Sequence, residues 1–169
     1  MKKIEAIVGN ITYPKSLSVI IPGNLSGLMT RGVAKDIVKA GWQKIAKEAK
    51  TTVKNGKYQI GDVFVTDSGR LKRRGTKHIF HLIIKRTPAD FTTIDIISKS
   101  LYKALNEAVK RKILSISICG IGIEEGDIEK KTAARIIVEI CEKYANLIDI
   151  KIIDKDEEFI SNVKEYLKE

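Results

Sequence analysis

Sulfur-containing and aromatic residues are scarce in this chain, and long apolar runs are missing. The 169 residues include two cysteines, two methionines, three prolines and one tryptophan, and only 6% are aromatic. No run of 18 apolar residues occurs, so the sequence contains no typical membrane-spanning helix. At the start, Glu5 and Gly9 interrupt the apolar residues, which favours a strand over a signal peptide. We therefore expect a cytoplasmic protein with no membrane partner.

The two cysteines and the two histidines predict no metal site. Cys119 and Cys141 lie in apolar contexts without partners at metal-ligand spacing, so we expect two buried thiols. His78 and His81 lie three residues apart on a predicted strand, and this spacing directs them to opposite faces. That arrangement excludes a shared metal ion, and we expect neither a metal nor another cofactor.

Positive charge is concentrated in one part of the chain. The net charge is +10, yet residues 31–86 contain fifteen lysines and arginines against four acidic residues. This segment has a local net charge of +11, which leaves −1 for the remainder. A regional excess attracts polyanions and phosphorylated ligands. A lysine-rich solvated surface of a heat-adapted protein explains the same feature, because Lys, Glu and Ile are frequent while Gln and Met are rare.

Strand and helix patterns alternate along the chain, which predicts an α/β fold. An apolar fraction of 43% and a charged fraction of 31% fit one globular domain over residues 1–169. We expect a three-layer α/β/α sandwich in which helices cover both faces of a mixed, mostly parallel sheet. The predicted strands are Ile4–Val8, Leu17–Ile21, Val63–Thr66, His78–Ile84, Ile113–Cys119 and Ile148–Ile153.

Four segments have the apolar periodicity of amphipathic helices. Thr92 and Thr93 are N-cap candidates for the second helix and Asp127 is the candidate for the third. Asp154 and Glu157 have the spacing of a capping box before the fourth. The predicted helices are Gly32–Lys50, Ile94–Lys112, Asp127–Tyr144 and a segment after Asp154.

Two glycine-containing loops connect a predicted strand to a predicted helix. The first is Pro22–Gly32 and the second is Gly120–Gly126. Ligands bind at the carboxyl ends of strands in open α/β sheets, and free amides at a helix start attract anions. The two loops therefore predict a site that clasps a diphosphate, although glycine loops are also ordinary connections.

Three motifs that follow one another along the chain extend this prediction of a diphosphate site. They are "VGNITYPKSLSVIIPGNLSGLMTRGVAKDI", "GDVFVTDSGRLKRRGTKHIFHLI" and "ISICGIGIEEGDIEKKTAARIIVEI". In order and spacing they resemble the macro domain family across nearly the whole chain. The resemblance implies a pocket for ADP-ribose, with adenine near "GNIT", the diphosphate between the two loops and the distal ribose near Asn24.

The resemblance carries over to individual positions. Asn24 matches the asparagine near the distal ribose and is the candidate catalytic residue, which would position water; a turn-forming asparagine is the alternative. Asn10 stands where the family usually has an aspartate that accepts a hydrogen bond from adenine, and Ile11 follows it. The implied ligand-binding residues are Asn10, Ile11, Asn24, Arg31, Gly32, Val33, Gly120, Ile121, Gly122, Ile123 and Glu124.

Several positions depart from the family pattern and predict a degenerate pocket. Met29, Thr30 and Arg31 replace a glycine run, so we expect their side chains to narrow the first loop. Arg31 either pairs with a phosphate or faces solvent. Glu124 replaces an aromatic residue and would repel a diphosphate, with Glu125 adding to the effect. Glycine at positions 29 and 30 should restore affinity if steric filling is the obstacle.

Two functions follow as expectations. The first is binding of ADP-ribose or a related nucleotide, with weak affinity or with ADP-ribosyl or phosphate hydrolase activity. The alternative is binding of RNA or DNA through the basic 31–86 surface, with few aromatic residues available for stacking on single strands. A third hypothesis is that the chain is a subunit of a larger assembly and that its pocket is vestigial.

Overall fold

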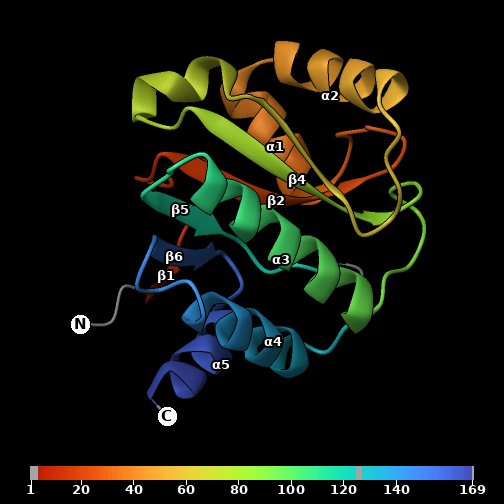
Figure 1. The fold of residues 1–169 in the computed structure, drawn as a ribbon. Coiled ribbons are helices and arrows are strands. Elements are labelled where there is room, and N and C mark those ends of the chain that lie inside the picture. Colours follow the sequence, from red (N-terminus) through yellow and green to blue (C-terminus); the bar gives the residue numbers. More distant parts are fainter. Residues whose placement is uncertain (1–3, 125–126, 169) are drawn as a thin grey trace.

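All strands described in the structure lie in one six-stranded sheet. The structure is a computed structural model that describes residues 4–124 and 127–168. The sheet order is β1-β6-β5-β2-β4-β3, with β3 antiparallel to β4 and the other neighbours parallel (Figure 1). The predicted mixed, mostly parallel sheet is therefore confirmed. The strands are β1 (Ile4–Val8), β2 (Ser18–Asn24), β3 (Val63–Asp67), β4 (His78–Lys85), β5 (Ser115–Ile118) and β6 (Asp149–Asp154).

Helices cover the sheet on both faces, which confirms the predicted α/β/α sandwich. The helices are α1 (Gly32–Gly41), α2 (Lys44–Asn55), α3 (Ile94–Lys110), α4 (Lys130–Glu142), α5 (Glu157–Lys168) and the 3₁₀ helix η1 (Gly69–Arg74). One layer contains α1 and α2, and the other contains α3, α4 and α5 (Figure 1). In the described part of the chain, no helix has the length and apolar character needed to cross a bilayer.

The central strands supply the core because their β-branched and aromatic side chains are covered from both sides. Ile20, Phe80 and Ile118 are fully buried. Cys119 and Cys141 are also buried, as predicted. Burial raises the pKa of the Cys119 thiol far above its usual range, with Asp154 and Glu124 adding to the effect, and burial raises the pKa of Cys141 to about 12. Both thiols therefore remain protonated at neutral pH.

The prediction of one continuous helix over residues 32–50 was wrong, because the chain forms α1 and α2 instead. The break lies at Trp42, whose φ of 85° is incompatible with a right-handed helix. Gly41 is buried directly before the break, where an added Cβ would clash with Ile45. The apolar stripe continues across the bend because both helices pack on the same face of the sheet, so periodicity alone concealed it.

Two predicted N-caps were also wrong. The third helix begins at Lys130, and the Asp127 carboxylate instead accepts a hydrogen bond from the backbone amide of Thr92 at 2.9 Å. Before α5 the cap is Asp156, which accepts from the backbone amide of Phe159 at 2.9 Å. Thr93 caps α3 as predicted, because its side chain accepts from the backbone amide of Ile96.

His81 is a buried, neutral histidine in β4. Its ring stacks on Phe64 with centroids 4.3 Å apart, and its Nε2 lies 2.9 Å from the Thr66 hydroxyl oxygen. Burial lowers the pKa of His81 to about 3. Since the unfolded chain has the ordinary histidine pKa of 6.5, it binds a proton between these values that the folded chain does not bind.

This difference predicts that the folded protein loses stability at pH values well above those at which carboxylates become protonated. The free energy of unfolding should fall by about 2 kcal/mol between pH 7 and pH 5, since one pKa unit is worth about 1.4 kcal/mol. Urea unfolding at the two pH values measures the change. The partly buried His78, whose pKa is lowered in the same direction, is removed in the control His78→Gln. Equal stability of this control at both pH values would contradict the assignment to His81.

The parallel strands bring several loops to one edge of the sheet. Since β1, β6, β5, β2 and β4 all run in the same direction, their carboxyl ends meet there. The last residues of β2, β4 and β6 are Asn24, Lys85 and Asp154. The loop before α1 and the loop after β5 also start at this edge, because β2 and β5 are neighbours. The topology thus builds the candidate site.

Candidate functional site

The two predicted strand-to-helix junctions meet at the N-terminus of α1. The Glu124 carboxylate, from the loop after β5, accepts a hydrogen bond from the backbone amide of Val33 at 3.2 Å. Gly32 allows this approach because it has a φ of 53° and because an added Cβ would clash with the Glu124 carboxylate. The free amides of a helix start attract anions. In this structure the chain's own carboxylate takes up that interaction.

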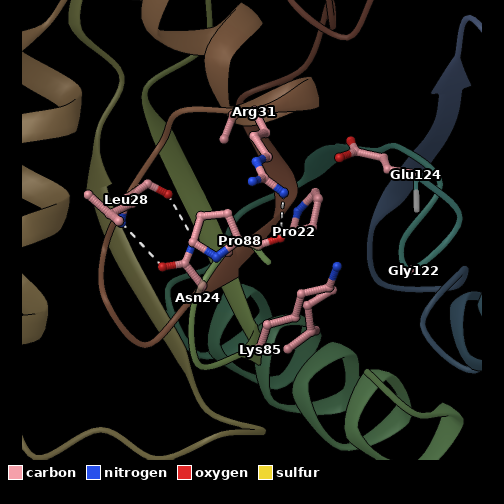
Figure 2. A pocket seen from close by; sticks show the side chains of 11 residues that line it. Pro22, Asn24, Leu28, Arg31, Lys85, Pro88, Gly122 and Glu124 are labelled. Atoms are coloured by element: carbon pink, nitrogen blue, oxygen red, sulfur yellow. Dashed lines mark hydrogen bonds between the residues drawn. The ribbon is translucent and has the colours of Figure 1, made fainter. Parts of the chain in front are cut away.

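A first pocket lies between the start of α1 and the end of β4 (Figure 2). It has a volume of about 50 Å³. The Arg31 guanidinium donates to the Pro88 carbonyl oxygen at 3.5 Å across its mouth. The lining residues are Pro22, Gly23, Asn24, Leu28, Arg31, Ala34, Ile84, Lys85, Pro88, Gly122 and Glu124.

Lys85 places a largely buried positive charge in this pocket. Its Nζ lies 3.3 Å from the Asp127 carboxylate, and the two side chains are 12% and 2% exposed. One Asp127 oxygen has no hydrogen-bond partner although it is buried. Removal of one member of such a buried ion pair is strongly destabilising, because the other charge is left buried without a partner. Asp127 therefore holds the Lys85 ammonium at the pocket wall, with Arg31 as a second cation nearby (Figure 2).

Asn24, the candidate catalytic residue, lines the same pocket and also braces its loop. Its side-chain oxygen accepts from the backbone amide and the hydroxyl of Ser26. The same oxygen accepts from the backbone amide of Leu28, and the side-chain nitrogen donates to the Leu28 carbonyl oxygen at 2.8 Å (Figure 2). Since an amide nitrogen has two donor hydrogens, one remains for a ligand. The geometry matches the turn-forming alternative, and the water-positioning role stays a prediction.

A second pocket lies on the other side of the contact between Glu124 and Val33. It also has a volume of about 50 Å³. Val33 lines this pocket and Glu124 lines the first, so the bond between the two residues divides the carboxyl edge into two hollows. The lining residues are Gly9, Asn10, Ile11, Val33, Asp36, Cys119, Ile153, Asp154 and Lys155.

The polar groups of the second pocket are engaged with the chain itself. The Asn10 side-chain oxygen accepts from the backbone amide and the hydroxyl of Thr12, at 2.9 and 2.8 Å. The Asp154 carboxylate accepts from the backbone amides of Gly120 and Asp156. Asp36 pairs with Lys155 at 3.5 Å at the rim. Asn10 thus offers a ligand mainly its nitrogen, which is a donor.

The remaining predicted residues divide into backbone and core positions. The side chains of Ile121 and Ile123 are buried, so only their backbone can reach a ligand. The steric role predicted for Met29 was wrong, because its side chain is 8% exposed and packs in the core. Thr30 and Arg31 are exposed. Glu125 and the end of the predicted second loop lie outside the described residues.

Sequence analysis missed Lys85, Asp36 and Asp154 as site residues. Lys85 and Asp154 are the last residues of parallel strands β4 and β6, whereas the predicted strands stopped one residue earlier. Extension of the carboxyl-end rule from two strands to all five parallel strands would have found both. Asp36 lies within α1, after its first turn and beyond the predicted loop, and no sequence signal pointed to it.

Comparisons with known proteins agree with this architecture. A macro domain of Oceanobacillus iheyensis with ADP superposes with a TM-score of 0.84 at 22% identity, covering 98% of this chain and 90% of that chain. A Trypanosoma brucei macrodomain in complex with ADP gives 0.81 at 17% identity, covering 97% and 68%. The macrodomain of Mycobacterium tuberculosis DarG gives 0.80 at 20% identity, covering 90% and 98%. At these identities the likeness shows the fold.

Sequence comparisons reach further. An uncharacterised protein of Aquifex aeolicus is 30% identical over 159 residues, which cover 93% of each chain. The family model for the macro domain matches residues 22–137. That region runs from the last residues of β2 into α4, and it includes both loops of the candidate site and the Lys85–Asp127 pair. This protein is therefore a member of the macro domain family.

Proposed function

We propose that the chain binds ADP-ribose or a closely related nucleotide along the carboxyl edge of the sheet. The adenine occupies the pocket of Asn10 and Ile11, and the diphosphate crosses the N-terminus of α1. The distal ribose enters the pocket of Asn24 and Lys85. Membership of the macro domain family supports this class of ligand, together with the solved macrodomains that contain ADP or ADPR, and the orientation is the one that the family resemblance implies.

The observation that carries the proposal is the carboxylate already bound at the start of α1. The Val33 amide donates a hydrogen bond to the Glu124 carboxylate there at 3.2 Å, between two pockets of similar size. A diphosphate offers the same kind of oxygen to the same amide. Lys85 and Arg31 supply positive charge on the distal side. Glu124 must move aside when the ligand binds, so we expect the affinity to be modest.

We propose binding rather than turnover. Among the described residues that line the two pockets, none is a histidine, and the Cys119 thiol is protonated because burial raises its pKa. Asn24 uses most of its hydrogen-bonding capacity within its own loop. At the described positions the two pockets therefore offer neither an imidazole base nor a thiolate nucleophile, which supports binding as the proposed role.

Isothermal titration calorimetry with ADP-ribose tests the proposal, and Asn10→Asp sharpens it. The aspartate keeps one oxygen for Thr12 and offers a second, charged oxygen to the adenine amino group. Hydrogen bonds to charged groups are stronger, so we expect about tenfold tighter binding of ADP-ribose and no change for ribose 5-phosphate.

Asn146→Asp is the matched control for this variant. It makes the same chemical change in the exposed turn before β6, at the opposite edge of the sheet, and should leave the affinity unchanged. A dissociation constant weaker than about 1 mM for both the parent chain and Asn10→Asp would contradict nucleotide binding at this edge.

A further inference from the structure

The 3₁₀ helix η1 combines strong positive charge with two exposed aromatic rings. The Arg70 guanidinium lies 4.6 Å from the centroid of the Trp42 ring, and the Arg74 guanidinium lies 3.7 Å from that of Tyr13. Trp42 and Tyr13 remain 57% and 59% exposed. Neither ring lines the two pockets of the candidate site, although Tyr13 lines a neighbouring hollow that also contains Asn10.

The rest of the fold holds both rings in place. Trp42 occupies the bend between α1 and α2, and Gly69 at the start of η1 packs so closely on Gly41 that an added Cβ would clash with its carbonyl oxygen. The Arg74 guanidinium donates to the Thr12 carbonyl oxygen at 2.6 Å, beside Tyr13. Since the rings and their arginines are positioned in advance, a ligand that stacks on them loses little conformational freedom.

The surrounding charge is positive and largely unneutralised. Lys72 pairs with Asp67 at 2.8 Å. Within the described residues, Arg70, Arg73 and Arg74 form no ion pair with a carboxylate. The adjoining helices α1 and α2 add the exposed lysines Lys35, Lys39, Lys44, Lys47 and Lys50.

We propose that this surface, named here the η1 platform and consisting of Tyr13, Trp42, Arg70, Arg73 and Arg74, binds single-stranded nucleic acid. The arginines contact phosphates, and unpaired bases stack on the ring faces that the arginines leave open. Arg70 and Arg74 are four positions apart in the 3₁₀ helix, a rise of about 8 Å, so one strand can contact both arginines and the ring beside each of them. A duplex keeps its bases stacked internally and cannot use the rings.

The sequence alone gave little sign that these two rings lie beside the basic residues. Tyr13 precedes residues 31–86 in sequence, and the fold brings it to Arg74. Trp42 lies within the segment, but only the bend after α1 exposes its ring.

Fluorescence anisotropy with labelled oligo-dT and oligo-U, and with a duplex of equal length, tests the proposal. Single strands should bind more tightly than the duplex. Three phosphate contacts predict a loss of about 20-fold in affinity between about 50 and 200 mM salt. Comparison of the affinities for oligo-dT and oligo-U shows whether the surface prefers DNA or RNA. No binding at low salt, a preference for duplex, or binding to anionic vesicles in place of oligonucleotides would overturn the proposal.

Variants separate stacking from charge. Trp42→Ala and Tyr13→Ala should each weaken single-strand binding at least about fivefold. Phe91→Ala, which removes another exposed ring, is the matched control and should have no effect. If the ring variants bind like the parent chain and only Arg70→Ala and Arg74→Ala lose affinity, the surface is purely electrostatic and the stacking proposal fails.

Tryptophan fluorescence supplies a second readout that needs no variant. Trp42 is the only tryptophan in the chain, so a base stacked on it should quench the emission. ADP-ribose in the groove should not. An unquenched signal at saturating oligonucleotide, or displacement of the oligonucleotide by ADP-ribose, would place the strand elsewhere. Either result leaves nucleotide binding in the groove untouched, so the two proposals fail independently.

Discussion

Glu124→Ala is expected to bind ADP-ribose at least about tenfold more tightly than the parent chain. The substitution removes the carboxylate that occupies the Val33 amide and leaves that amide free for a phosphate oxygen. It also removes a negative charge that would lie beside the diphosphate. Isothermal titration calorimetry at low and moderate salt measures the gain, and the gain should shrink as salt screens the charge.

Two further variants define the cause. Glu124→Gln keeps the shape and the acceptor oxygen but removes the charge, so a gain equal to that of alanine identifies electrostatic repulsion. A gain confined to alanine identifies occupation of the amide. Glu139→Ala, on the exposed face of α4, is the control for a general change in charge. If neither Glu124 variant binds more tightly, the diphosphate does not cross the start of α1.

Met29→Gly should destabilise the fold without any gain in affinity. The Met29 side chain is buried in the core, and truncation of a buried methionine costs about 2–5 kcal/mol even when alanine replaces it. Glycine adds backbone entropy to the unfolded chain. Urea unfolding measures the loss, and calorimetry on the folded fraction measures the affinity.

Two neighbouring substitutions test this interpretation. Met29→Leu conserves volume and should cost less than about 1.5 kcal/mol. Thr30→Gly alters an exposed residue and should leave the core intact. Tighter binding of ADP-ribose by folded Met29→Gly would restore the steric explanation for a weak site. Together with the Glu124 variants, these measurements decide whether charge or volume limits the groove.

The fold class was predictable because its signals are local. Short β-branched runs indicated all six strands within a few residues, and glycine marked the loops at their ends. The order of motifs also placed both site loops on parallel strands. Errors arose where a local signal has two outcomes. The apolar stripe across Trp42 fits one straight helix or two bent ones, and Asp127 suits either a helix cap or an ion pair.

The site was predictable only as a region. Asn24, Gly32 and Val33 were placed correctly at the carboxyl edge, but the partner of Val33 was not. Glu124 was expected to repel a ligand from a nearby position, whereas it binds the helix start itself. Lys85 was overlooked because its partner Asp127 is 42 residues distant in sequence. An ion pair between residues so far apart cannot be recognised from one sequence.

The sequence by itself determined the layered α/β architecture, the two strand-to-helix loops and the basic segment, since periodicity and glycine positions act over a few residues. Only the tertiary structure decided which groups meet. It brought Glu124 to Val33 across 91 residues, buried Met29 and set Tyr13 against Arg74. The physical reason is that such contacts depend on the register of packed layers, where a shift of one residue would turn each side chain toward a different neighbour.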